Sequence, residues 1–230
     1  RNSYTMAGQQ KPFVVGGVGV QPGLDDVVRV AVHGQPVALD PAGAERVKRT
    51  SPPPKNFLAE EHCAAADGDA SAVTLNLEQC RAVICVKLIQ LVHGRSAVRL
   101  QVPEFLAALL NTGVLPTLAT SLVDAPLLRQ LADACYGEGT AHADGALGSQ
   151  ALSAALTAAA GRDLLQLSAS ERSVLESGAA CSAGVGALAV QGSKTLLSLA
   201  TAAAALSFEA VGAQVKCLEA ELVEAQGPQS

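Results

Sequence analysis

The chain has 230 residues, of which 49% are hydrophobic and 16% charged, with a formal net charge of -5. This composition is enough to bury a substantial core in one domain or two closely packed ones, and it excludes a disordered tail. Lysines and arginines are scattered, 3% of the residues are aromatic and there is no tryptophan, so we expect no nucleic-acid partner.

The cysteines predict buried, reduced thiols rather than a disulfide framework or a metal site. Most fall within apolar runs, and the histidines are dispersed without the paired spacing of zinc ligands. We therefore expect no metal and no cofactor. Reduced thiols are typical of intracellular proteins, so we expect a cytoplasmic or cytoskeletal location, with an organelle matrix left open because the chain begins at Arg1 rather than at methionine. The cysteines are Cys63, Cys80, Cys85, Cys135, Cys181 and Cys217.

Two segments near the N-terminus lack the pattern of a core. Residues 1–23 are rich in glycine, with few core-forming side chains, and predict an arm. Residues 50–72 contain three consecutive prolines and several acidic side chains, which predicts a linker.

The segment between them, residues 24–49, predicts a small separate element. The valines within residues 24–33 favour a strand by their propensity. Asp25 and Asp26, near the start of the same segment, instead suit the first turn of a helix. Residues 37–39 are extended. Asp40 followed by Pro41 is typical of a helix start, and we expect that helix to reach about residue 49.

Residues 73–213 predict a helical core. A helix that is apolar on most sides, and therefore buried, begins near Glu78. The next opens at Pro103 and stops before Gly113, where start and stop signals agree. Leucines at helical spacing predict a further helix over residues 127–136.

The alanine-rich end of this core raises the question of a membrane. Ser168 and Glu171 fit a capping box, followed by two or more helices. Residues 178–213 carry only Lys194 and Glu209 as charges and are long enough to span a bilayer. Their polar side chains disfavour insertion, so we predict a buried pair of core helices and no membrane insertion.

Two further patterns favour packing over chemistry. Gly184, Gly186 and Ala189 match a relaxed dinucleotide-binding spacing, but no strand precedes them, so close helix packing is the better interpretation. Residues 214–230 predict an amphipathic C-terminal helix and tail. Its apolar stripe predicts the contacts with a partner: Val215, Leu218, Leu222 and Val223.

An ordered set of short segments runs through most of the chain. The most specific are residues 81–99 and the run Leu109-Leu110-Asn111-Thr112-Gly113-Val114-Leu115-Pro116; residues 23–28, 37–40, 125–139, 167–178 and 203–210 continue the order. Together they resemble the aromatic amino acid lyases, which include histidine and phenylalanine ammonia-lyases. The resemblance implies a mainly α fold, with an ammonia-lyase-like helical core and a small N-terminal α/β element, truncated relative to the family. It also implies that residues 24–33 are helical.

At the positions of the family's catalytic groups, the sequence departs from the family. The family's electrophile forms by cyclisation of Ala-Ser-Gly, whereas the run after Pro116 reads Thr117-Leu118-Ala119-Thr120-Ser121-Leu122-Val123-Asp124. The nearest counterpart is Ala119-Thr120-Ser121. Its central threonine and its third residue, which carries a side chain, would both hinder cyclisation. The tyrosine loop corresponds to the linker, which has no tyrosine, and Asn-Gly-Thr appears as Ser177-Gly178-Ala179. We predict no catalytic residues and no enzymatic activity.

The absence of the family's catalytic groups predicts a pseudoenzyme that serves as a structural or scaffold subunit of a larger assembly. Its expected partners are other protein subunits of a hetero-assembly, among them a homologous lyase-like chain. Two alternatives stay open: an ammonia-lyase-type subunit completed by a catalytic paralogue, and a regulatory module that binds an amino acid.

Overall fold

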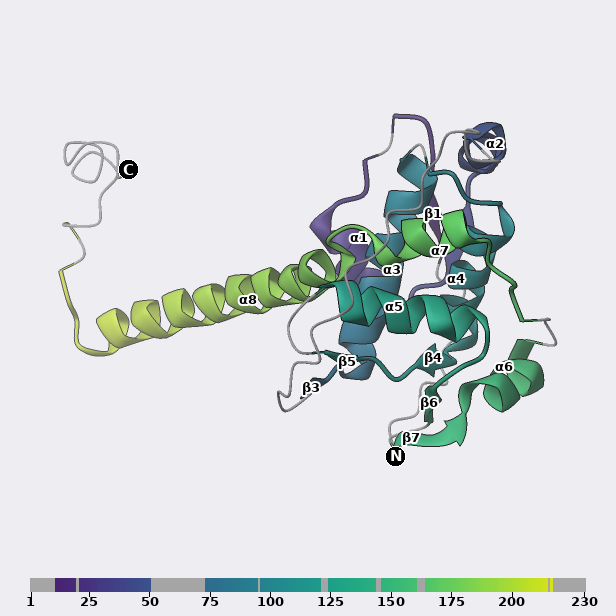
Figure 1. Cartoon of the computed structure of the whole chain (residues 1–230). Helices are drawn as coiled ribbons and strands as arrows, with labels where there is room; N and C mark the ends of the chain where they lie inside the picture. Colours follow the sequence, from purple (N-terminus) through teal and green to yellow (C-terminus); the bar gives the residue numbers. More distant parts are fainter. Residues whose placement is uncertain are drawn as a thin grey trace. The chain divides into compact units, whose positions relative to one another are not determined.

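The computed structural model describes residues 11–19, 21–50, 73–94, 96–120, 124–143, 146–160, 164–214 and 216. The chain divides into two compact units, Arg1–Leu188 and Ala189–Ser230, a boundary that falls inside the range 73–213 predicted as one core. Helices predominate in the described part (Figure 1), which confirms the mainly α fold. The predicted linker lies outside the described residues, except Thr50.

The N-terminal element is a pair of parallel strands, and the helix α1 (Leu24–Val32) connects one strand to the other along the chain. Strand β1, Phe13–Val15, pairs with β2, Val37–Leu39, in the register Phe13↔Val37 and Val15↔Leu39. The arm predicted over residues 1–23 therefore contains a buried strand: Phe13 and Val15 point into the core. Three residues between Pro12 and Gly16 are too short a run for periodicity to reveal a strand.

Helix α1, Leu24–Val32, forms where valine propensity favours a strand. The Asp26 carboxylate accepts a hydrogen bond from the Gly23 backbone N–H at 2.8 Å, which stabilises a helix start. Val27, Val30 and Ala31 recur at helical spacing and are buried, and α1 packs on α3. Tertiary packing thus outweighs local propensity, and the helix implied by the family resemblance is confirmed.

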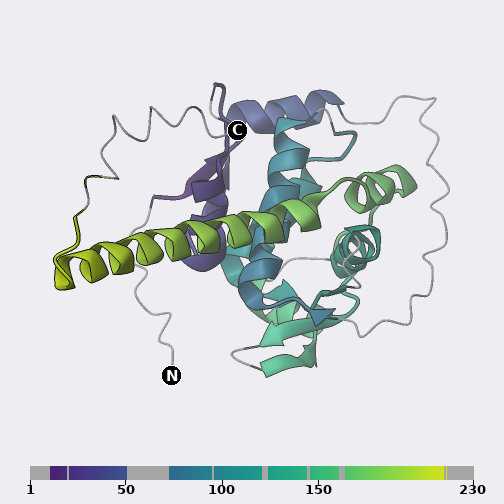
Figure 2. The same cartoon turned by 90° about the vertical axis from the view of Figure 1, so that its left-hand side faces the viewer.

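Helix α3, Leu77–His93, is the centre of the first unit (Figure 2). Asn76 caps its start by accepting from the Gln79 N–H at 2.8 Å. The helix is buried on several sides and packs against α1, α2 (Pro41–Thr50) and α4 (Gln101–Thr112). Helix α4 ends at Gly113, whose φ of 73° lies in the left-handed region that favours glycine, as predicted.

Short strands gather near one end of α3 (Figures 1 and 2). Strand β3 (Val73–Thr74) pairs antiparallel with β5 (Ala119–Thr120). Strands β4 (Leu115–Pro116), β6 (Thr140–Ala143) and β7 (Ala146–Ala151) form an antiparallel sheet in that order. The remaining helices of the first unit are α5 (Asp124–Cys135), α6 (Leu152–Ala160) and α7 (Ala169–Glu176).

The start of α7 is fixed by the predicted capping box and by an ion pair. The Ser168 hydroxyl accepts from the Glu171 N–H at 3.3 Å, and the Glu171 carboxylate accepts from the Ser168 N–H at 2.9 Å. The same carboxylate accepts from the Arg99 backbone N–H at 2.9 Å and from its Nε at 2.8 Å. Glu171 therefore ties α7 to the segment before α4.

Glu171→Gln is expected to lower the free energy of unfolding at pH 7 by about 1–2 kcal/mol. Burial alone would raise the pKa of Glu171, but hydrogen bonds from Arg99 and Ser168 hold that pKa at about 2. Because this value lies below the ordinary 4.5, the stabilisation is present above about pH 4.5 and is lost as the pH falls toward 2.

Urea denaturation at pH 7 and at pH 3 measures this effect. The difference in stability between the wild type and Glu171→Gln should shrink in acid, and an equal difference at both pH values would contradict the prediction. Glu78→Gln is a matched control, because Glu78 is exposed and a surface change of this kind stays within about 0.5 kcal/mol.

Helix α8, Ala180–Ala210, crosses the boundary between the two units. Ala180, Cys181 and Gly184 are buried, whereas every residue from Gly192 to Ala210 is exposed. The predicted buried pair of helices is therefore wrong: one continuous helix forms, and most of it lacks cover from the described chain. Apolar composition signals burial, and it does not distinguish cover by the same chain from cover by another.

A stretch that begins with α7 and ends with α8 meets a length-and-hydropathy test for a membrane span. In the described residues one helical segment, Ala169–Ala210, is long and apolar enough, with a mean hydropathy of 1.4. A core helix also passes this test, so the finding is weak evidence for a membrane.

The thiols are buried where the structure describes them. Cys80, Cys85, Cys135 and Cys181 are free and buried, which confirms the predicted burial for these four. Burial raises the pKa of Cys80, Cys85 and Cys135 to about 12. These thiols are therefore protonated and poorly reactive at neutral pH.

Candidate functional site

The segment after Pro116 leads into the two-residue strand β5 and is held by hydrogen bonds of its backbone. The Thr117 N–H donates to the Thr140 carbonyl at 2.7 Å, and the Leu118 carbonyl accepts from the Leu75 N–H at 2.9 Å. The Gln130 side chain bonds both backbone groups of Ala119, accepting from its N–H at 2.9 Å and donating to its carbonyl at 2.7 Å. The described part of this segment thus serves packing; residues 121–123 lie outside the described residues.

Asp124, the last residue of this run and the first of α5, caps the start of α8. Its carboxylate accepts from the Ser182 backbone N–H at 2.9 Å and from the Ser182 hydroxyl. The free N–H groups in the first turn of a helix are a preferred site for a carboxylate. Asp124 therefore joins the starts of α5 and α8, and its hydrogen bonds are used in that contact.

A buried ammonium lies against the Ser177-Gly178-Ala179 segment. Lys87 Nζ donates to the carbonyls of Val174 at 2.8 Å and Ser177 at 2.6 Å. These carbonyls belong to the end of α7, where a positive charge is favourable. Burial lowers the pKa of Lys87 to about 8. The lysine thus stabilises the end of α7, and nothing predicted this role from the sequence.

Cys80 and His142 form a second pair that sequence reasoning missed. Cys80 Sγ lies 3.5 Å from His142 Nε2, a distance typical of a thiol–imidazole pair in nucleophilic catalysis. Burial raises the pKa of Cys80 to about 12 and lowers that of His142. Both groups are therefore neutral at pH 7, without the thiolate that such chemistry needs.

Metal coordination finds no support in the part of the chain that the structure describes. No group of three or more histidine, cysteine, aspartate or glutamate side chains comes together there. The Cys80–His142 pair supplies two ligands, fewer than a structural zinc site requires.

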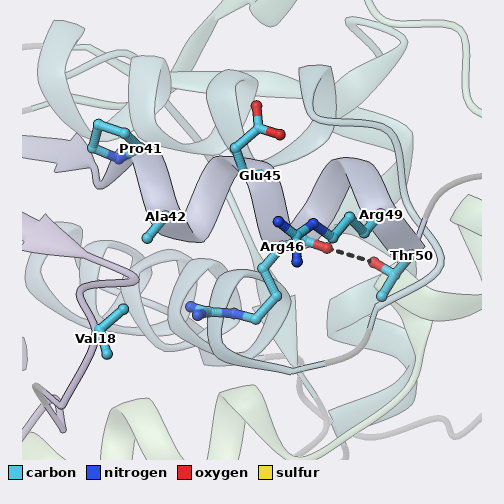
Figure 3. A pocket seen from close by; sticks show the side chains of 7 residues that line it. All are labelled: Val18, Pro41, Ala42, Glu45, Arg46, Arg49 and Thr50. Carbon is cyan, nitrogen blue, oxygen red and sulfur yellow. Dashed lines mark hydrogen bonds between the residues drawn. The ribbon is translucent and has the colours of Figure 1, made fainter.

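A pocket of about 650 Å³ lies beside α2 (Figure 3). Its Arg46 guanidinium donates to the Gly16 carbonyl at 3.0 Å and to the Val92 carbonyl at 3.1 Å, and Glu45 pairs with Lys48 at 2.7 Å. The pocket therefore presents no free pair of acid and base. Its lining residues are Val18, Pro41, Ala42, Glu45, Arg46, Arg49 and Thr50.

The four predicted partner contacts, Val215, Leu218, Leu222 and Val223, lie outside the described residues. The structure instead shows exposed apolar side chains on α8 and, at Val211, just after its end. Their exposed fractions are 48% for Val190, 68% for Leu196, 69% for Leu197, 64% for Leu199, 71% for Leu206, 41% for Phe208 and 77% for Val211.

Comparison with known proteins gives the class. The family described as aromatic amino acid lyase matches residues 54–229. The histidine ammonia-lyase of Treponema denticola is 28% identical over 236 residues, covering 87% of this chain and 45% of that protein. The histidine ammonia-lyase of Gloeobacter violaceus is 28% identical over 221 residues, covering 81% of this chain and 42% of that protein. The chain belongs to the aromatic amino acid lyase family.

Solved structures show the same fold. A phenylalanine aminomutase from Pantoea agglomerans matches with a TM-score of 0.79 and 20% sequence identity. A histidine ammonia-lyase from Trypanosoma cruzi matches with a TM-score of 0.78 and 19% sequence identity. Each match covers 94% of this chain and 47% of the other chain. The chain thus spans less than half the length of these relatives.

Proposed function

We propose that this chain is a non-catalytic structural subunit that assembles with other lyase-like chains. The observation that carries the proposal is the exposed apolar surface of α8. From Val190 to Val211, seven large apolar side chains are between 41% and 77% exposed. Exposed apolar side chains gathered on one helix are typical of a surface that another protein covers.

The chemistry of the catalytic positions supports the non-catalytic part of the proposal. No Ala-Ser-Gly occurs in the 230 residues, and Ala119 is fixed by Gln130. Asp124 caps α8, and the Cys80 thiol, with its raised pKa, stays protonated at pH 7. General acid–base or nucleophilic catalysis needs a free group of suitable pKa within reach of a substrate. The buried free thiols also favour an intracellular assembly.

The full chain, incubated with L-histidine, L-phenylalanine or L-tyrosine, is expected to release no ammonia above the blank, because the electrophile precursor is missing. Ammonia detection and absorbance of an unsaturated acid product measure this. An intact histidine ammonia-lyase serves as the positive control. Turnover that co-purifies with the chain would overturn the non-catalytic assignment, and turnover only after adding an intact lyase would favour a subunit completed by a paralogue.

A further inference from the structure

Three parts of the chain meet in close contact where β1 ends. Gly16 follows β1 and is buried, and it packs against α2 and the end of α3. A Cβ on Gly16 would lie 2.5 Å from Val92 Cγ1 and 2.9 Å from Gly43 Cα, and its φ of 98° lies in the region that favours glycine. The turn that begins at Gly16 is therefore held directly against both helices.

Both backbone polar groups of Gly16 bind side chains of other elements. Its carbonyl accepts from Arg46 Nη2 at 3.0 Å, and the same guanidinium donates to the Val92 carbonyl at 3.1 Å. Its N–H donates to His93 Nε2 at 3.1 Å. A ring nitrogen accepts a hydrogen bond only when it carries no proton, so this bond requires the neutral form of His93. The position of the turn is thus linked to the protonation of one histidine.

The surroundings of His93 oppose a positive charge on its ring. Burial and then the positive charge of Arg46 lower the pKa of His93. Strands β1 and β4, which also pack on α3, carry no titratable side chain. The other charged side chains on the three helices packed against α3 are Asp25, Asp26 and Arg29 of α1, Glu45, Lys48 and Arg49 of α2, and Glu104 of α4. Of these, Asp26 pairs with Arg29 and Glu45 with Lys48.

Acid converts the acceptor on His93 into a donor. The protonated ring presents an N–H at Nε2 that faces the Gly16 N–H, and it places a second positive charge beside Arg46. The hydrogen bond is then lost, and a buried Gly16 N–H without an acceptor disfavours the closed position of the turn. The strand pair does not depend on this bond, because the Phe13 N–H donates to the Pro36 carbonyl at 2.8 Å, a contact without a titratable group.

The same turn forms one side of the pocket beside α2. Val18 follows Gly16 by two residues, and Figure 3 shows it across the pocket from the lining residues of α2. Arg46, which binds the Gly16 carbonyl, also lines the pocket. A movement of the turn away from α3 therefore changes the width of the pocket.

We propose that the Gly16–His93 hydrogen bond is an acid-sensitive latch: protonation of His93 releases the turn of residues 16–19 from α3 and opens the pocket beside α2. The pair of strands β1 and β2 stays in place. This inference goes beyond the proposed assembly function and does not depend on it, since every contact that it uses lies within the first unit.

Amide hydrogen exchange of the full chain, followed residue by residue by NMR at pH 7.5 and pH 5, tests the latch. The latch should hold above about pH 6.5 and weaken below it, because the released ring binds a proton more tightly than the latched ring. After correction for the intrinsic effect of pH on exchange, protection of the Gly16 amide should fall in acid by up to about 30-fold, the limit set by an ordinary histidine pKa of about 6.5. Protection of the Phe13 amide should stay constant.

The variant His93→Gln offers an amide oxygen as acceptor and does not titrate, so its Gly16 protection should be equal at both pH values. His33→Gln is the matched control, because His33 is exposed and this variant should behave like the wild type. The same acid-induced fall in His93→Gln would overturn the latch.

The wild type alone provides a second test, which does not depend on the folding of a variant. The fall in Gly16 protection should follow the protonation of the His93 ring, read from the resonances of that ring. Constant Gly16 protection, or a fall at a pH where His93 does not titrate, would contradict the inference. A parallel loss at Phe13 would contradict it too, because the strand pair would then open as a whole.

Discussion

Gly184→Ala is expected to lower the free energy of unfolding by about 1–3 kcal/mol. Gly184 is buried where the start of α8 crosses α3. A Cβ at this position would lie 2.8 Å from the Val83 backbone nitrogen and 2.9 Å from the Ala82 carbonyl carbon. Backbone atoms cannot rotate away as the end of a side chain can, so the two helices would have to move apart.

The same substitution two residues later is the matched control. A Cβ on Gly186 would meet no atom within 4 Å, so Gly186→Ala should stabilise the protein by about 0.5–1 kcal/mol, since alanine favours the helix. Chemical denaturation of both variants measures the difference. Equal effects of the two substitutions would contradict close packing of α8 on α3.

Lys87 is expected to make stability depend on pH in the alkaline range. Its folded pKa of about 8 lies below the ordinary 10.5 because burial disfavours the ammonium. Between these values the unfolded chain holds a proton that the folded chain has released, so the contribution of Lys87 to stability rises with pH. The full rise is at most about 3 kcal/mol, from about 1.4 kcal/mol for each tenfold change in proton affinity.

The measurement compares the wild type with Lys87→Met in urea at pH 7, 8.5 and 10. The stability of the wild type relative to the variant should increase across this series. Thiols of raised pKa, such as Cys80 and Cys85, lower the stability of both proteins at high pH and cancel in the comparison. Lys48→Met is the control, because Lys48 is exposed and its hydrogen bond to Glu45 raises its pKa. A flat difference for Lys87→Met would show that its ammonium is not destabilised by burial.

Local sequence signals predicted the helix ends, because caps act over a few residues. Ser168 with Glu171, and Gly113 with its positive φ, stand where the pattern placed them. The valines of α1 show the limit of such signals: they favour a strand, whereas the Asp26 cap and the packing on α3 favour the helix that forms over residues 24–32. The glycines of the Gly184–Gly186 spacing were interpreted as close packing, which is confirmed for Gly184 but not for Gly186, where an added Cβ would meet no atom within 4 Å.

The candidate site was less predictable, because it depends on contacts between distant residues. His142 reaches Cys80, 62 positions away, only because β6 pairs with β4, and Asp124 meets Ser182 across 58 positions. Neither contact leaves a periodic signal. The sequence predicted two or more helices in the alanine-rich stretch after Glu171, and it did not reveal that α8 is continuous from Ala180 to Ala210.

Native mass spectrometry of the full chain, purified without denaturant, tests the assembly claim most directly. It counts the chains in each particle while the surfaces of α8 are intact. Particles with at least two lyase-like chains are expected, because the large apolar side chains of α8 need cover. A monomer at micromolar concentration, with no other chain bound, would show that this chain does not act as a subunit of such an assembly.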